Sequence, residues 1–157
     1  MPTDTQLDVA DEVEQALTTL LRGPRIRRLH QLLIARAGVS LDRPGYIALS
    51  SLADQGPLRM SDLADACGVD ASTMSRQADH LLTSSLIERD TPAADGRAVV
   101  MRLSAKGKRL IRLLKSVRRQ ALQELLSRWE EPEQQHFAEL LTRFVRDTER
   151  TLVETES

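Results

Sequence analysis

Residues 60–79 carry the pattern that most constrains the fold, because they place a small residue, a flexible turn and apolar contacts in a fixed order. Ala64 is small enough for two helices to approach closely, and Gly68 can take the positive φ that a tight turn requires. Four apolar side chains are expected to lock these helices together: Leu63, Cys67, Val69 and Met74. Two short helices that meet in this way form a helix-turn-helix.

A β-hairpin is predicted directly after these two helices. The extended runs at 86–89 and 98–103 are rich in apolar and β-branched residues, and the loop at 90–97 contains Pro, Asp and Gly. No other part of the sequence gives a strong β signal. Helix, helix and then hairpin is the order of a winged helix-turn-helix, in which the hairpin is the wing.

Helical periodicity accounts for most of the remaining chain, so the fold class is mainly α with a small β-hairpin wing. Predicted helices occupy residues 5–36, 43–53, 62–67, 71–84, 104–128 and 132–152, and the expected N-caps are Asp42, Ser61, Asp70 and Ser104. Gly23-Pro24 interrupts the first helix, where we expect a kink or a break with Pro24 opening the second half. The amphipathic last helix is expected to bury its apolar strip against a partner.

Composition narrows the classes of protein that this chain can be. Aromatic residues make up only 3% of the sequence, so the core must be aliphatic, which suits helices. The sequence lacks a membrane-spanning apolar run, and its N-terminus is acidic where a signal peptide would be basic and then apolar. The lone Cys67 cannot form an intrachain disulfide. We therefore expect a cytoplasmic protein without a membrane partner.

The net charge of −1 conceals a strongly basic middle segment. Residues 59–119 hold 12 basic and 7 acidic side chains, whereas residues 120–157 hold 4 basic and 9 acidic ones. A basic segment between acidic ends favours an anionic partner. Together with the winged helix-turn-helix, this distribution predicts binding to double-stranded DNA.

The second helix of the motif presents polar side chains at its N-terminal end, where a recognition helix enters the major groove. Arginine and glutamine there can read base edges, while hydroxyl groups hold phosphates. The predicted DNA-binding residues are Ser61, Ser72, Thr73, Ser75, Arg76, Gln77, Asp95 and Arg97. Arg97, near the tip of the wing, can reach the minor groove. Alternatively, it forms a salt bridge with Asp95 that shapes the loop, and both can hold if the acid orients the arginine.

These motifs resemble the MarR family of multiple-antibiotic-resistance-type regulators. The most specific part of the resemblance is Asp95-Gly96-Arg97 before the second wing strand, followed by Leu103-Ser104 and Lys106-Gly107. Leu63-Ala64, Gly68-Val69-Asp70, Ser72-Thr73 and Ser75-Arg76 also match. The resemblance implies a homodimeric, ligand-responsive repressor that binds a pseudo-palindromic operator. It also implies that residues 41–103 form the DNA-binding domain, and that residues 1–40 and 104–157 form a helical dimerisation domain. Gly23-Pro24 departs from the family pattern.

Family resemblance also implies a small anionic or lipophilic effector. A pocket is expected where the predicted helices 5–36, 43–53 and 104–128 meet, near His30, Tyr46 and Arg112. Tyr46 could donate a hydrogen bond to a carboxylate or a phenol in that pocket. The alternative is that Tyr46 is a core residue whose hydroxyl group reaches the surface.

No other residue pattern supports a competing chemistry. Cys67 occupies an inward position of the motif, so we interpret it as a packing residue and not as a peroxide sensor. The three histidines are widely separated and lack metal-ligand spacing, and no catalytic motif is present, so neither metal, cofactor nor enzyme activity is expected. The competing hypothesis is a winged-helix protein-interaction module that does not bind DNA.

Overall fold

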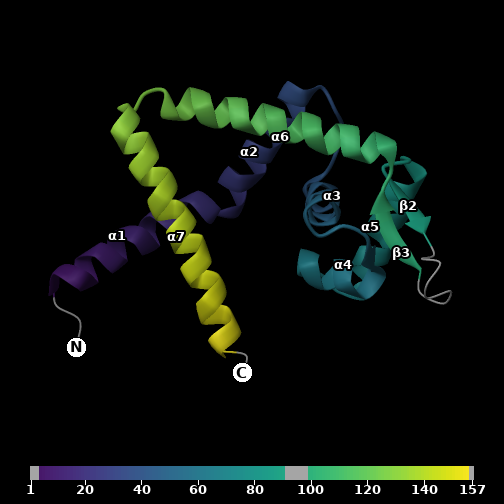
Figure 1. Ribbon diagram of the computed structural model, residues 1–157, viewed down its shortest axis with the longest axis horizontal. Coiled ribbons are helices and arrows are strands. Elements are labelled where there is room, and N and C mark those ends of the chain that lie inside the picture. Colours follow the sequence, from purple (N-terminus) through teal and green to yellow (C-terminus); the bar gives the residue numbers. More distant parts are fainter. Residues whose placement is uncertain (1–3, 91–98, 156–157) are drawn as a thin grey trace. The chain divides into compact units, whose positions relative to one another are not determined.

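The computed structural model describes the backbone of residues 4–90 and 99–155 and the side chains of residues 8–90 and 99–151 (Figure 1). The chain divides into two compact units, Met1–Val117 and Arg118–Ser157. Their boundary falls within α6 (Ala105–Leu126), so this helix begins in the first unit and ends in the second.

A winged helix-turn-helix forms the centre of the first unit, as the sequence predicts. Its elements are α3 (Arg43–Gln55), β1 (Leu58–Arg59), α4 (Met60–Cys67), α5 (Ala71–Thr83), β2 (Ile87–Asp90) and β3 (Val100–Leu103). The sheet is antiparallel in the order β1-β3-β2, and Met101 on the central strand pairs with Leu58 on one side and with Arg89 on the other. Strand β1 was not predicted, because two residues are too few to show a period.

The core of the first unit lies between these three helices and the sheet. Leu63, Met74 and Ala64 are buried, as expected for the contacts that lock α4 onto α5, while Cys67 and Val69 are half-buried at its edge. The largest fully buried side chains are Leu49, Leu63, Met74, Leu81 and Ile87. Helix α6 adds Ile111 to the same core, so the start of α6 is fixed to the winged helix-turn-helix.

The predicted first helix is broken in two. Helix α1 (Asp4–Leu21) is followed by α2 (Gly23–Ala37), and Arg22 alone separates them. Pro24 lies in the first turn of α2, where the missing backbone donor does not interrupt a helical hydrogen bond. The break at Gly23-Pro24 is therefore confirmed, and its cause is the proline.

Three of the four predicted N-caps are confirmed. The Asp42 carboxylate accepts a hydrogen bond from the Gly45 amide at 3.0 Å, and the Asp70 carboxylate accepts one from the Thr73 amide at 2.8 Å. The prediction for Ser61 is wrong, because α4 begins at Met60 with Arg59 as its N-cap. Arg59 belongs to β1, so strand pairing decides where this helix starts, and the Ser61 hydroxyl donates to Asp62 instead.

Ser104 caps α6 and also joins this helix to Ser85 and Leu86, the two residues that precede β2. Its hydroxyl accepts a hydrogen bond from the Gly107 amide at 2.9 Å and donates toward the carbonyls of Ser85 and Leu86 at 2.7 and 3.1 Å. The Ser104 amide also donates to the Leu86 carbonyl at 3.1 Å. A Cβ at Gly107 would lie 2.0 Å from that carbonyl oxygen, so only glycine allows this approach. We call Ser85, Leu86, Ser104 and Gly107 together the Ser104–Gly107 joint.

The second unit contains the end of α6 and α7 (Glu131–Thr155). The rings of Trp129 and Phe137 pack edge to face near the turn between the two helices, with centroids 5.2 Å apart. Much of the apolar surface of α7 is exposed, at Phe137, Leu140, Leu141, Phe144 and Val145. Among the described residues, no helix is long and apolar enough to cross a lipid bilayer.

Candidate DNA-binding surface

The N-terminal end of α5 is organised by Asp70. Its carboxylate accepts hydrogen bonds from the hydroxyls of Ser72 and Thr73, at 2.5 and 2.7 Å, in addition to the Thr73 amide. These bonds, that of Ser72 first, hold the pKa of Asp70 well below its usual range. Both hydroxyl protons are already donated to Asp70, so Ser72 and Thr73 offer only oxygen lone pairs to an approaching ligand. To donate to a ligand, either hydroxyl must first break its bond to Asp70.

Ser75 and Arg76 lie on the exposed side of α5. Within the described part of the chain, Arg76 forms no ion pair, so its guanidinium is available to an external partner. The buried residues of the same helix, Met74, Ala78 and Leu81, fix the helix to the core. A helix anchored on one face presents Arg76 on the other without a large loss of backbone entropy on binding.

Gln77 has a different position from its neighbours. It is half-buried, and its Nε2 atom donates a hydrogen bond to Asp42 Oδ1 at 3.1 Å. Asp42 is the N-cap of α3, so this bond ties the recognition helix to α3. A Cβ at Gly45 would lie only 2.9 Å from Gln77 Nε2, which shows how closely the two helices approach.

Of the predicted DNA-binding residues outside α5, the structure describes Ser61 alone. Ser61 is exposed on α4, and its hydroxyl is 3.2 Å from Asp62 Oδ1. Asp95 and Arg97 fall outside the described residues. The structure therefore brings Ser72, Thr73, Ser75 and Arg76 together on one surface, which we call the α5 surface.

Ion pairs join the strands at the base of the wing. Arg102 on β3 contacts Glu88 at 2.7 Å and Asp90 at 3.1 Å, both on β2. Arg89 lies 3.5 Å from Asp79 on α5, which connects the strand to the recognition helix. All of these side chains are at least 42% exposed, so the pairs contribute little to stability and serve mainly to align the strands.

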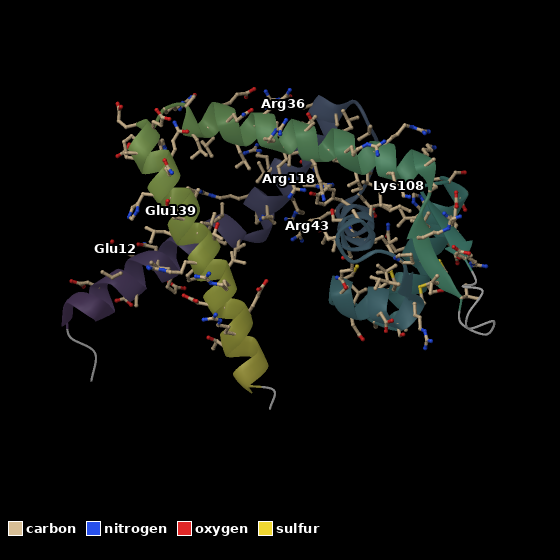
Figure 2. All side chains as sticks on the ribbon, in the orientation of Figure 1. Glu12, Arg36, Arg43, Lys108, Arg118 and Glu139 are labelled. Atoms are coloured by element: carbon tan, nitrogen blue, oxygen red, sulfur yellow. The ribbon has the colours of Figure 1, made fainter. Side chains whose placement is uncertain are left out.

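The start of α6 contacts the end of α5. Lys106 Nζ donates a hydrogen bond to the Ser84 carbonyl at 2.8 Å, so a cation lies at the C-terminus of the recognition helix, where the helix dipole favours it. Lys108, labelled on α6 in Figure 2, lies two residues after Lys106 and on another face of the helix.

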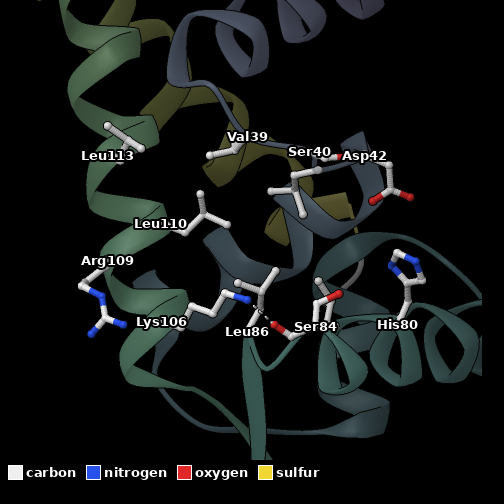
Figure 3. A pocket seen from close by; sticks show the side chains of 12 residues that line it. Val39, Ser40, Asp42, His80, Ser84, Leu86, Lys106, Arg109, Leu110 and Leu113 are labelled. Carbon is white, nitrogen blue, oxygen red and sulfur yellow. Dashed lines mark hydrogen bonds between the residues drawn. The ribbon is translucent and has the colours of Figure 1, made fainter.

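A cavity of about 640 Å³ lies beside this contact (Figure 3). Its walls come from the α2–α3 connection, the C-terminal half of α5 and the first turns of α6. Leu81, Leu86, Leu110 and Leu113 supply apolar surface. The charged and titratable side chains that line it are Asp42, His80, Lys106 and Arg109.

The residues predicted to form an effector pocket divide between two places. The rings of His30 and Tyr46 are 5.6 Å apart, and His30 Nε2 lies 3.2 Å from the carbonyl of Leu41, which lines the cavity. Arg112 instead lines a separate groove of about 580 Å³ with Arg102, Lys108 and Lys115. Sequence reasoning missed Lys106 and Arg109 as cavity residues. The spacing 106, 109, 110 and 113 defines one helical face and could have indicated them.

Cys67 occupies a packing position near α3. Burial raises the pKa of its thiol, and a hydrogen bond with Ser51 opposes that effect only in part. A thiol with a raised pKa is a poor nucleophile at neutral pH. The described residues also contain no cluster of three or more His, Cys, Asp or Glu side chains that could hold a metal ion.

Comparisons with known proteins agree with this architecture. Residues 41–99 match the sequence model of the MarR family. YxaD of Bacillus subtilis (strain 168), an uncharacterized HTH-type transcriptional regulator, is 32% identical over 131 residues, which cover 83% of this chain and 89% of YxaD. A MarR family protein from Bacillus stearothermophilus has a TM-score of 0.80 at 20% identity, over 90% of this chain and 96% of that one. The PcaV transcriptional regulator from Streptomyces coelicolor, in complex with its natural ligand, has a TM-score of 0.54 at 26% identity, over 82% of this chain and 94% of that one.

Proposed function

Because the chain belongs to the MarR family of transcriptional regulators, we propose that it is a homodimeric repressor that binds a pseudo-palindromic operator and releases it when a small molecule binds. The α5 surface carries this proposal. It places an exposed arginine, without an ion-pair partner among the described residues, on a helix whose opposite face is buried. In this scheme Arg76 reads a base edge, and Ser75 and the first amides of α5 contact phosphates.

DNA binding is tested by mobility-shift titration of the full-length chain at two salt concentrations. Specific binding that weakens steeply with salt supports the proposal, because phosphate contacts release counterions. Arg76→Ala should weaken binding by about 1–3 kcal/mol per bidentate contact and relax discrimination at one position of each half-site. Arg143→Ala, which removes an arginine that is also exposed but lies on α7, is the control.

Two outcomes would contradict DNA binding by this surface. If both Arg76→Ala and the Arg143→Ala control bind DNA like the wild type, the α5 surface is not where DNA binds. If no specific sequence is bound at any salt concentration, a winged-helix module that recognises protein replaces the repressor.

Dimerisation is proposed from apolar surface on the helices outside residues 41–103. Residues 1–40 and 104–157 would then form the dimerisation domain and residues 41–103 the DNA-binding domain. The large apolar side chains of the dimerisation domain that are exposed are Val9, Val13, Leu20, Leu21, Leu29, Leu32, Leu113, Leu122, Leu125, Trp129, Phe137, Leu140, Leu141, Phe144 and Val145. So much apolar surface is unusual on a monomer and typical of an interface. Light scattering across protein concentrations measures the oligomeric state directly.

Ligand response is proposed to act through the cavity beside Lys106. An apolar wall with Lys106 and Arg109 suits an anionic molecule with an aromatic or aliphatic body. A carboxylate bound by Lys106 competes with the Ser84 carbonyl for the same ammonium, and would loosen the hold of α6 on the recognition helix. The PcaV transcriptional regulator from Streptomyces coelicolor, which is similar to this chain, binds a natural ligand, and this supports the proposal.

The effector proposal is tested with benzoate and related aromatic carboxylates. Binding should raise the melting temperature and weaken the DNA complex. Lys106→Met removes the ammonium but keeps the apolar stem, so it should abolish both effects. Lys108→Met, which faces the separate groove on α6, should leave both unchanged. Carboxylate binding that survives Lys106→Met would locate the effector elsewhere.

A further inference from the structure

The two N-terminal helices carry opposite charges with complete segregation. Helix α1 contains five acidic residues and no basic one, and residues 22–41, which include α2, contain five arginines and no acidic residue. The acids are Asp4, Asp8, Asp11, Glu12 and Glu14, and the arginines are Arg22, Arg25, Arg27, Arg28 and Arg36. Helix α7, by contrast, mixes both signs along its length.

The described charged side chains of both helices are exposed, and Glu12 on α1 and Arg36 on α2 are labelled in Figure 2. Among the described side chains, no ion pair joins an α1 carboxylate to Arg25, Arg27 or Arg28. Apolar side chains lie beside the charges. Val9, Val13, Leu20 and Leu21 on α1 are 43–61% exposed, and Leu29 and Leu32 on α2 are 48% and 57% exposed. Each helix therefore offers an apolar strip next to charges of one sign.

These complementary helices cannot lie side by side within one chain. Arg22 is the only residue between them, and an antiparallel pair of helices needs a connection of about two to five residues. The opposite charge for α1 therefore does not come from α2 of the same chain, whereas α2 of a second copy can supply it. In a two-fold dimer every contact occurs twice, so α1 of each copy can meet α2 of the other.

We propose that α1 of one protomer packs against α2 of its partner, so that their segregated charges select a second copy of this chain and set the register of the pair. This inference rests on the proposed homodimer and specifies which helices meet and why. Apolar contacts between the strips provide affinity, while the carboxylate–arginine pairs provide specificity. The break at Gly23-Pro24 is what separates the acidic helix from the basic one.

Two charge-reversed variants test the pairing. The acid-reversed chain carries Asp8→Lys, Asp11→Lys and Glu12→Lys, and the base-reversed chain carries Arg25→Glu, Arg27→Glu and Arg28→Glu. Alone, each would place like charges in both contacts of its own dimer, so its dissociation constant should rise by about tenfold or more at low salt. An equimolar mixture restores both contacts and should form a heterodimer as tight as the wild type, and the chain with all six changes should form homodimers again.

Sedimentation equilibrium at low and high salt measures these constants, and circular dichroism verifies that each variant is folded. Asp62→Lys with Asp65→Lys on α4 is the matched control for added positive charge and should leave the constant unchanged. A wild-type chain that stays monomeric overturns the proposed homodimer itself. A wild-type dimer that tolerates both reversals, or a mixture that fails to form heterodimers, overturns only the α1–α2 pairing. Rescue of the acid-reversed chain by Arg118→Glu with Arg119→Glu also overturns it, because α6 would then be the partner of α1.

Discussion

The Ser104–Gly107 joint should be intolerant of a single methyl group at Gly107. In Gly107→Ala the new Cβ would lie 2.0 Å from the Leu86 carbonyl oxygen, whereas carbon–oxygen contacts are ordinarily about 3.3 Å or longer. Helix α6 must therefore move away by roughly 1 Å or more. That carbonyl also accepts the Ser104 amide and is approached by the Ser104 hydroxyl, both at 3.1 Å, so the same movement breaks or stretches these hydrogen bonds.

The expected loss of stability follows from these two effects. Overpacking of this kind destabilises by about 1–3 kcal/mol, and each weakened hydrogen bond adds about 0.5–1.5 kcal/mol. The higher helix propensity of alanine returns about 1 kcal/mol. The free energy of unfolding should therefore fall by about 1–5 kcal/mol, which lowers Tm by roughly 2–20 °C for a chain of this size.

Urea denaturation followed by circular dichroism measures this loss, at equal protein concentration for every variant because a dimer's stability depends on concentration. Gly23→Ala is the matched control, since a Cβ there would meet only the flexible end of Arg27, at 3.3 Å. It should be neutral or slightly stabilising. A Gly107→Ala chain as stable as the wild type would show that α6 does not approach the Leu86 carbonyl as described.

Two further substitutions test the N-terminal cap of the recognition helix and the hydrogen bond that ties this helix to α3. Asp70→Ala should lower the urea midpoint at pH 7. Because the pKa of Asp70 is depressed in the folded state, the ionised carboxylate stabilises the fold above the ordinary pKa of 3.8, and this stabilisation is lost as the pH falls below 3.8. The difference in midpoint between Asp70→Ala and the wild type should therefore shrink at pH 3. An equal difference at both pH values would exclude a role for the ionised carboxylate. Gln77→Ala should weaken binding to all operator sequences alike, because the side chain anchors α5 to Asp42. A change in base preference at one position would show instead that Gln77 reads DNA.

The helix-turn-helix and most caps could be predicted because their chemistry is local. Asp42, Asp70 and Ser104 each satisfy an amide three residues further along the chain, so residue type and spacing suffice. Ser61 has the same residue type and fails, because Arg59 is held in a strand by pairing with Val100. The start of α4 is thus decided by a partner far away in the sequence.

The candidate site was harder to predict for the same reason. Gln77 looks like its neighbours on a helical projection, but its partner Asp42 lies 35 residues earlier and turns the side chain toward α3. The start of α6 carries a run of basic residues. Helical geometry divides it, with Lys106 and Arg109 lining the cavity while Lys108 and Arg112 line the opposite groove. Which face meets the cavity depends on the packing of Ile111 and Leu114 into the core.

The start of α6 holds the end of α5 through two contacts of different strength. The bond from Ser104 to the Ser85 carbonyl is buried at least in part and belongs to the joint that Gly107 makes possible. The bond from Lys106 to the Ser84 carbonyl is exposed and borders the cavity. A buried bond is expensive to break, whereas an exposed ammonium exchanges partners readily. The proposed ligand in the cavity would therefore loosen the recognition helix through Lys106, while Ser104 would keep the winged helix-turn-helix folded.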